Sequence, residues 1–209
     1  MSPRIISLEG NIGAGKSTLL LELATRGLPD GWVLLEEPVD LWDTFRDEHG
    51  KTMLEKFYAD PQKYAFAFQI MAYTTRLNAL QRLIREKNPV GILCERSLMA
   101  DHEVFAKMLR DDGSLEKVMY DIYVAQAATT HKHLDAVIYL DVDVETCLSR
   151  IATRGRQGED AATREYLQKC ETYYASWLTT TTQIPVYNVS GRLPMAGLVE
   201  QVLSHLIES

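Results

Sequence analysis

The sequence predicts an α/β fold built on a five-stranded parallel sheet that helices cover on both faces. Five short apolar runs lie along the chain, and long stretches of helical character separate them, which is the pattern of repeated βαβ units. The hydrophobicity of these runs is continuous rather than alternating, as expected for strands that are buried on both faces of a parallel sheet. The predicted strands are residues 4–8, 32–35, 90–94, 136–142 and 184–189.

A glycine-rich loop follows the first predicted strand and leads into a helix. Its sequence is GNIGAGKST, which matches the pattern GxxxxGK[ST] through Gly10, Gly15, Lys16 and Ser17. Glycines let the backbone N–H groups turn toward phosphate oxygens, and the helix N-terminus adds partial positive charge. Lys16 is expected to reach the β- and γ-phosphates of ATP, and the Ser17 hydroxyl is expected to bind Mg²⁺. The loop residues assigned to the nucleotide are Gly10, Asn11, Ile12, Gly13, Ala14, Gly15, Lys16, Ser17 and Thr18.

The composition is that of a globular protein, and its net charge limits the possible partners. The 209 residues are 46% hydrophobic and 24% charged, and no repeat or linker divides them, so we expect one domain over residues 1–209. A net charge of −7 argues against a general nucleic-acid or membrane-surface binder. Any positive charge that binds phosphate must therefore be concentrated locally.

The N-terminus and the cysteines both favour a cytoplasmic location. Residues 1–4 run directly into the first strand, so we expect no signal or transit peptide. No apolar run approaches the roughly 18 residues that a membrane span requires. Cys94, Cys147 and Cys170 lie far apart and form no CxxC pair, which predicts reduced thiols.

Charged residues follow the second and third predicted strands, where open parallel sheets bind their ligands. Glu37 stands before Pro38 and could orient an acceptor hydroxyl and accept its proton late in the reaction. Glu95 could bind Mg²⁺ or act as the base itself. Arg96 could neutralise charge between donor and acceptor and hold Glu37 in position. The alternatives are a surface acid at Glu37 and a structural ion pair at Glu95 and Arg96.

Arginines gather in the segment 150–160, which supplies the local positive charge that the composition requires. Arg150 and Arg154 are one helical turn apart, and Arg156 follows them between two glycines. We expect an arginine-rich lid that stabilises a transferring phosphoryl group and excludes water. A solvated basic turn is the alternative.

The longest helical segment is predicted to begin at Asp60 and Pro61. An apolar seam then recurs at intervals of three and four residues. A second stripe beside it alternates small residues with hydrogen-bonding residues, and by itself this stripe indicates a solvated flank. The seam comprises Phe66, Ile70, Tyr73, Leu77, Leu80 and Ile84, and the stripe comprises Ala65, Gln69, Ala72 and Arg76.

Together these motifs resemble the deoxynucleoside kinase family, over a stretch from Ile5 to about Trp177. The resemblance implies a P-loop kinase fold and transfer of the ATP γ-phosphate, with Mg²⁺, to the 5′-hydroxyl of a deoxynucleoside. It also implies a homodimer formed through long helices. The matching motifs are GNIGAGKST, EPV with Trp42, Tyr58, FxFQ at 66–69, ERS at 95–97 and RGRxxE at 154–159.

The resemblance also implies a role for each matching residue. Glu37 would contact the 5′-hydroxyl, and the base would be either Glu37, which we favour, or Glu95. Gln69 would bind the base edge, and Tyr58 and Glu159 would bind the 3′-hydroxyl. The implied substrate-binding residues are Glu37, Trp42, Leu54, Tyr58, Phe68, Gln69, Arg76, Arg96, Asp101, Phe105 and Glu159, and the lid residues are Arg150, Arg154 and Arg156.

Arg76 and Asp101 bear on which base is chosen. In the family this pair looks like the type that prefers deoxyadenosine, deoxyguanosine or deoxycytidine, because the pair reads an amino group or ring nitrogen and crowds the thymine methyl. Two other functions compete with this interpretation. One is a nucleoside monophosphate kinase of the same fold, and the other is a non-catalytic nucleotide-binding relative.

Overall fold

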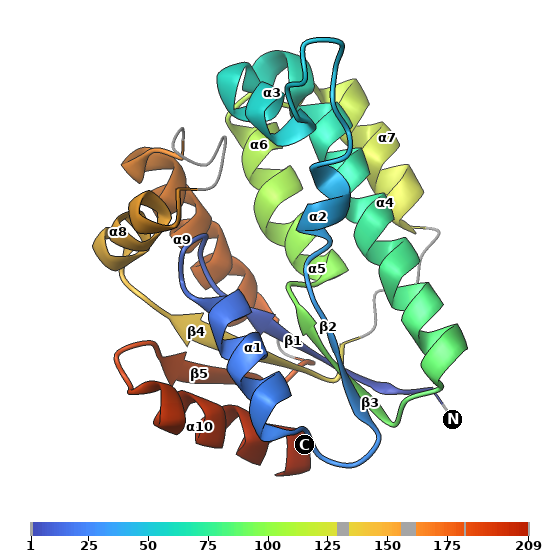
Figure 1. Ribbon diagram of the computed structural model, residues 1–209. Coiled ribbons are helices and arrows are strands. Elements are labelled where there is room, and N and C mark those ends of the chain that lie inside the picture. Colours follow the sequence, from blue (N-terminus) through green and yellow to red (C-terminus); the bar gives the residue numbers. More distant parts are fainter. Residues whose placement is uncertain (1, 129–133, 156–161, 182, 209) are drawn as a thin grey trace.

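The computed structural model describes residues 2–128, 134–155, 162–181 and 183–208. Its centre is a five-stranded sheet in the order β2-β3-β1-β4-β5, with every neighbouring pair of strands parallel (Figure 1). The predicted α/β class and the parallel sheet are confirmed, and each strand lies within two residues of its predicted bounds. The strands are β1 (Arg4–Glu9), β2 (Trp32–Leu35), β3 (Gly91–Glu95), β4 (Ala136–Asp141) and β5 (Val186–Ser190).

Helices connect the strands and cover both faces of the sheet (Figure 1). A π-helix, η1 (Asp101–Ala106), continues directly from α5 into α6. The α-helices are α1 (Lys16–Arg26), α2 (Val39–Trp42), α3 (Met53–Ala59), α4 (Pro61–Lys87), α5 (Leu98–Ala100), α6 (Lys107–Asp111), α7 (Lys117–Ala128), α8 (Val144–Arg154), α9 (Arg164–Thr180) and α10 (Met195–Glu208).

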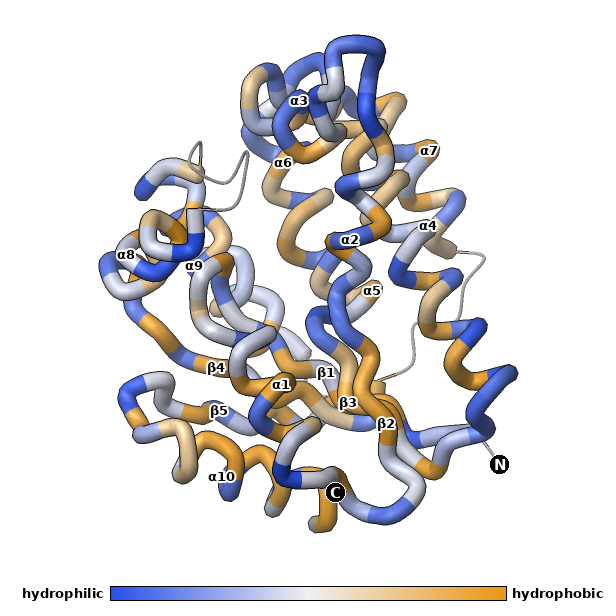
Figure 2. The backbone as a smooth tube through the Cα atoms, viewed as in Figure 1, coloured by the Kyte–Doolittle hydropathy of each residue, from blue (hydrophilic) through white to orange (hydrophobic). Residues whose placement is uncertain are grey.

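Successive residues of each central strand point into two different hydrophobic layers. In β1, Ile6 and Leu8 pack in the layer that contains residues of α1, α8 and α10. Ile5 packs in the opposite layer, with residues of η1 and α9. Both faces are therefore apolar, which explains why the strand sequences are continuously hydrophobic. Figure 2 shows this concentration of hydrophobic residues along the centre of the sheet.

Helix α4 begins at the predicted position, and its polar stripe is buried rather than solvated, as the site roles implied for Gln69 and Arg76 require. Asp60 caps the helix by accepting a hydrogen bond from the Lys63 N–H, and Pro61 occupies the first turn. The stripe is the most buried face of the helix, whereas most of the apolar seam is half-buried against α7. Gln69, Ala72 and Arg76 of the stripe line a cavity, and Ala65 packs in an apolar cluster with Phe57. Its exposed fractions are Ala65 0%, Gln69 2%, Ala72 4% and Arg76 3%.

The cysteines agree with the prediction of reduced thiols. Cys94, Cys147 and Cys170 are free and buried. Burial raises the pKa of Cys94 to about 12, so its thiol stays protonated at neutral pH. None of the helices in the described part of the chain has both the length and the apolar character that crossing a membrane requires.

Candidate active site

A cavity of about 620 Å³ lies beyond the carboxyl ends of β1, β2 and β3. It extends from the glycine-rich loop to a wall formed by α3, α4 and η1. Almost all of the predicted site residues line this cavity, although they come from segments far apart in the sequence. Those that line it are Ile12, Gly13, Ala14, Gly15, Lys16, Ser17, Thr18, Glu37, Trp42, Leu54, Tyr58, Phe68, Gln69, Arg76, Glu95, Arg96, Asp101, Phe105, Arg150 and Arg154.

Four predicted residues are not among this lining. Gly10 lies at the start of the loop, where its carbonyl accepts a hydrogen bond from Lys16 Nζ at 3.1 Å. The Asn11 side chain points away from the nucleotide side and donates to the Leu167 carbonyl of α9 at 2.9 Å. Asn11 therefore anchors the loop to a helix. Arg156 and Glu159 lie outside the described residues.

The loop adopts a conformation that requires glycine. Gly13 has φ 80°, and a Cβ atom there would lie 2.5 Å from the Cys147 carbonyl oxygen of α8. Gly15 has φ 99° and directly precedes α1. Without side chains at these two positions, the loop packs closely against α8 and leaves its inner surface open to phosphate.

Lys16 lies buried at the base of the loop. Its ammonium group donates to the carbonyls of Gly10 and Asn11, at 3.1 Å and 2.9 Å. Burial, together with the positive charge of Arg96, lowers the pKa of Lys16 to about 8, although Glu95 and Glu37 oppose the shift. Before an anion binds, Lys16 therefore loses its proton at a lower pH than an exposed lysine does.

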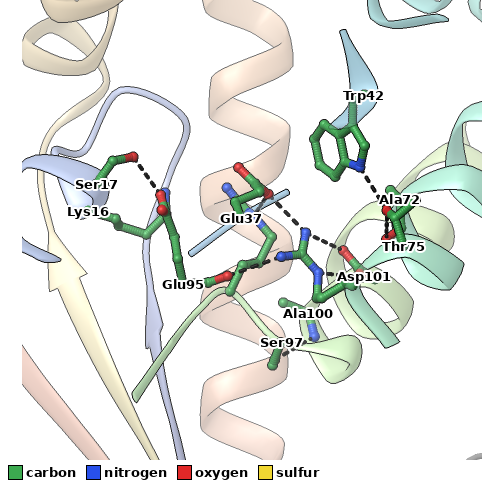
Figure 3. Close-up of polar contacts among 12 residues, drawn as sticks. Lys16, Ser17, Glu37, Trp42, Ala72, Thr75, Glu95, Ser97, Ala100 and Asp101 are labelled. Atoms are coloured by element: carbon green, nitrogen blue, oxygen red, sulfur yellow. Dashed lines mark hydrogen bonds and ion pairs between the residues drawn. The ribbon is translucent and has the colours of Figure 1, made fainter. Parts of the chain in front are cut away.

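Ser17 and Glu95 form an oxygen pair at the N-terminus of α1. The Ser17 hydroxyl donates to Glu95 Oε1 at 2.7 Å (Figure 3). A hydroxyl beside a carboxylate, next to a phosphate-binding loop, is a donor set that suits Mg²⁺. These two residues therefore fit the metal role that the sequence predicts for them.

Glu37 lies between two arginines. Its Oε1 atom accepts hydrogen bonds from Arg76 Nη2 at 2.9 Å and from Arg96 Nε at 3.3 Å. Burial alone would raise the pKa of Glu37, but the charges of Arg96 and Arg76 and the hydrogen bond from Arg76 outweigh it and lower the pKa to about 2. Glu37 is therefore ionised across the whole neutral range.

Arg76 connects Glu37 to the far end of the cavity. Its Nε donates to Asp101 Oδ2 at 2.9 Å, and its Nη1 donates to the Glu95 carbonyl at 3.0 Å. Because Arg76 Nη2 also donates to Glu37, these hydrogen bonds place the guanidinium group between Glu37 and Asp101, both of which are labelled in Figure 3. Close by, Gln69 is 2% exposed, and none of the described residues donates a hydrogen bond to its Oε1 atom. That buried oxygen is available to a ligand.

Aromatic residues form an apolar wall at this end. Phe57 and Phe68 stack with their ring centroids 4.6 Å apart, and Trp42 packs edge-on against Phe68 at 5.8 Å. The Trp42 indole donates to the Thr75 hydroxyl at 2.8 Å, which fixes its orientation (Figure 3). Such a flat, apolar space suits a planar ring. Phe57 and Tyr166 also line it, and we missed both because nothing but their aromatic character marks them in the sequence.

The opposite end of the cavity lies beside α8. Arg150 donates to the Ala14 carbonyl of the loop at 2.6 Å, and Arg154 lines the cavity one turn further along the helix. Sequence reasoning did not find several residues here, because they become neighbours of the loop only through the order of β1, β4 and β5. They are Ser149, Thr153, Gly191, Met195 and Leu198.

Comparison with known proteins agrees with this geometry. Residues 6–206 match the family model for deoxynucleoside kinases. The chain belongs to the deoxynucleoside kinase family. This membership confirms the resemblance seen in the motifs and identifies the chain as a nucleotide-binding phosphotransferase. The family assignment covers nearly the whole chain, both the loop and the wall that faces it.

Individual relatives in the deoxynucleoside kinase family are about one-third identical to the chain. The deoxycytidine kinase of Homo sapiens is 32% identical, and the match covers 92% of this chain and 82% of the relative. The deoxyadenosine/deoxycytidine kinase of Bacillus subtilis (strain 168) is 35% identical over 87% and 80% of the two chains. A probable deoxycytidine kinase of Fowlpox virus (strain NVSL) is 30% identical over 89% and 78%.

Proposed function

We propose that the protein transfers the γ-phosphate of ATP to the 5′-hydroxyl of a deoxynucleoside and so produces the 5′-monophosphate. The observation that carries the proposal is the single cavity that joins a triphosphate loop to an apolar, amide-bearing acceptor end, with Glu37 and Arg96 between them. A donor and an acceptor bound at these two ends would bring the reacting groups together at that point.

The charges at the acceptor end favour a nucleoside over a nucleoside monophosphate. Arg76 and Arg96 are the cations that line this end among the described residues, and both are already paired with Glu37. Arg76 is also paired with Asp101. An acceptor phosphate would meet these carboxylates and be repelled, whereas a neutral hydroxyl can accept or donate hydrogen bonds there.

Each polar residue between donor and acceptor has a proposed role. Glu37 orients the 5′-hydroxyl and accepts its proton late, when bond formation has made that proton acidic, so a pKa of about 2 is compatible with the role. Arg96 stabilises charge on the transferring group. Glu95 and Ser17 hold Mg²⁺, which would neutralise charge on the phosphate oxygens when bound, and Glu95 remains the alternative base.

The remaining residues bind the two ends of the substrate pair. On the donor side, the loop residues 10–18 and the lid arginines Arg150, Arg154 and Arg156 hold the phosphates. On the acceptor side, Gln69 uses its open oxygen to read the base edge. The proposed apolar wall is Trp42, Leu54, Phe68 and Phe105, and the proposed 3′-hydroxyl contacts are Tyr58 and Glu159.

The base preference is proposed from Arg76 and Asp101. Their ion pair is buried and lines the same cavity as Gln69, where it would meet the polar edge of the base and leave little room for the thymine methyl group. Deoxycytidine and deoxyadenosine appear in the names of the relatives from Homo sapiens and Bacillus subtilis. We therefore propose that deoxyadenosine, deoxyguanosine and deoxycytidine are preferred over thymidine.

A substrate panel tests the reaction and the base preference together. The protein is incubated with ATP and Mg²⁺ and each of the four deoxynucleosides or their monophosphates, and ADP formation is followed. We expect deoxynucleosides to be phosphorylated, with the best at least about tenfold above thymidine in kcat/KM. Thymidine as the best substrate would contradict the base preference, and activity on monophosphates alone would contradict the reaction.

A second test uses the lowered pKa of Lys16. A bound nucleotide is expected to restore the charge of Lys16, so with a pKa of about 8 the binding of MgADP should take up clearly more protons at pH 8.5 than at pH 7. Affinity should consequently fall as the pH rises through about 8. Calorimetry in buffers of different ionisation enthalpy measures the uptake.

The control for this experiment is Lys16→Arg, which keeps a fixed positive charge over the same pH range. Its proton uptake should be close to zero at both pH values. Equal uptake by the native protein at pH 7 and pH 8.5 would show that Lys16 does not titrate in this range.

The domain organisation, location and oligomeric state are proposed from the sequence and from its resemblance to the deoxynucleoside kinase family. We propose that residues 1–209 act as one catalytic domain in the cytoplasm, without nucleic-acid or membrane partners, and that the protein is a homodimer. Exposed apolar side chains on α7, Val118 and Ile122, support an association of copies through the long helices.

A further inference from the structure

Arg96, which is proposed to stabilise the transferring group, is fixed by its backbone conformation and by three side-chain contacts. It has a left-handed backbone with φ 62° and is 5% exposed. Its Nε atom donates to Glu37 at 3.3 Å, and its guanidinium carbon lies 4.5 Å from the centre of the Phe105 ring. A third contact lies on the side away from Glu37, where Nη1 donates to the Tyr174 hydroxyl at 2.5 Å.

Tyr174 also contacts a second carboxylate, that of the buried Glu9. The Tyr174 hydroxyl donates to Glu9 Oε2 at 2.9 Å, and the Ser97 hydroxyl donates to Glu9 Oε1 at 2.6 Å. Ser97 also accepts a hydrogen bond from the Ala100 N–H, so it is itself fixed at the start of α5. Tyr174 and Glu9 are both fully buried.

We propose that Tyr174 and Glu9 form a relay that positions Arg96 for phosphoryl transfer. This inference rests on the proposed function. Neither residue is part of the cavity lining, so both act through Arg96 rather than on the substrate. They come from α9 and from the end of β1, and they lie 165 residues apart in the sequence.

The Arg96 guanidinium group needs a hydrogen-bond partner on the side opposite Glu37. If Glu37 were its only polar partner, Arg96 would be drawn entirely onto that carboxylate, which must also meet the acceptor hydroxyl. The tyrosine hydroxyl, polarised by Glu9, holds the opposite side of the group. None of the described residues accepts a hydrogen bond from Nη2, so this nitrogen keeps its donors for the transferring phosphoryl group.

The inference distinguishes a positioning role from a purely structural one. Tyr174 also packs against Tyr139, Phe105 and Trp177, so it contributes to the core as well. Loss of core packing would lower stability without a specific effect on Arg96. Loss of the relay would instead lower kcat and leave the binding of nucleoside and nucleotide nearly unchanged, because the cavity lining stays intact.

The experiment compares Tyr174→Phe and Glu9→Gln with the native enzyme, using its best deoxynucleoside substrate. The first variant removes only the hydroxyl, and the second removes only the charge. We expect each to lower kcat by about 10- to 100-fold, with KM for the deoxynucleoside within about twofold. In the Arg96→Lys background, Tyr174→Phe should lower kcat by less than about a further twofold, because the relay would no longer have its target.

The matched control is Tyr173→Phe, one residue away on the same helix. Its hydroxyl donates to Asp111 at 2.7 Å on the surface, outside the site. This variant should keep native kcat. A Tyr174→Phe enzyme with native kcat would overturn the inference, and so would an equal loss of activity in the Arg96→Lys background.

A readout without turnover keeps the inference separate from the proposed function. In protein labelled with ¹⁵N-arginine, the Arg96 Nη signals, assigned through Arg96→Lys, should be distinct in the native protein. In Tyr174→Phe and Glu9→Gln they should become averaged by rotation about the Cζ–Nη bonds. Unchanged signals in both variants would overturn the relay. An inactive native protein with these expected signals would contradict only the proposed function.

Discussion

Glu37→Gln is expected to lower kcat by about 10²- to 10⁴-fold while the affinity for MgATP stays within about threefold. A glutamine amide cannot accept the proton of the 5′-hydroxyl. It also removes the negative charge that Arg76 and Arg96 share, so both guanidinium groups lose their common partner. Steady-state kinetics with the best deoxynucleoside and calorimetry with nucleotide measure the two quantities.

The neighbouring Glu36→Gln is the control, because Glu36 is exposed and precedes Glu37 directly in the chain. It should retain native turnover. Glu95→Gln forms a third arm that separates the two candidate bases. If Glu95 is the metal-side carboxylate, its variant should need a higher Mg²⁺ concentration for half-maximal activity. Unchanged turnover of Glu37→Gln would remove Glu37 from the mechanism.

Arg76→Met is expected to lower the free energy of unfolding by about 3–5 kcal/mol. Arg76 is 3% exposed, and its guanidinium group pairs with Asp101 and Glu37, so its removal leaves the buried Asp101 without its ion-pair partner and leaves the partly exposed Glu37 with Arg96 alone. Burial raises the pKa of Asp101, and Arg76 is the largest influence that opposes the rise. Denaturant unfolding measures the loss, and Arg85→Met, on the exposed face of the same helix, is the control.

The double variant Arg76→Met/Asp101→Leu should recover part of this lost stability, because it removes the buried Asp101 carboxylate that the single variant leaves without its ion-pair partner. The double variant should also discriminate less strongly against thymidine. We expect the ratio of kcat/KM for thymidine to that for deoxycytidine to rise by about tenfold or more, since an apolar surface replaces the ion pair near the base. A single variant as stable as the native protein, or an unchanged ratio in the double variant, would contradict the proposed role of the pair.

The course of helix α4 shows how far the sequence could predict this site. Asp60 and Pro61 located its start, because capping depends on neighbouring residues. The apolar seam suggested which face would be buried, yet Gln69 and Arg76 on the other stripe are the more deeply buried residues. Periodicity records the chemical character of a face, and only the packing of other elements decides whether a polar face is solvated or lines a cavity.

Asn11 and Tyr174 show the same limit for single residues. Asn11 belongs to the loop by sequence, but its side chain binds the Leu167 carbonyl, 156 residues away. Tyr174 carried no signal in the sequence, since an aromatic residue within a helix usually marks only a core position. Its contact with Arg96 exists because α9 packs beside the end of β3. Contacts between distant segments leave no mark on either segment alone.

The sequence by itself determined the strands, the glycine-rich loop and the family, because each depends on residues close together in the chain or on motifs in a fixed order. Only the tertiary structure decided how the charges are shared. It places Glu37 between Arg76 and Arg96, joins Arg76 to Asp101, and connects Arg96 through Tyr174 to Glu9. These pairings depend on distances of about 3 Å between segments that the parallel sheet brings together, and residue order does not specify such distances.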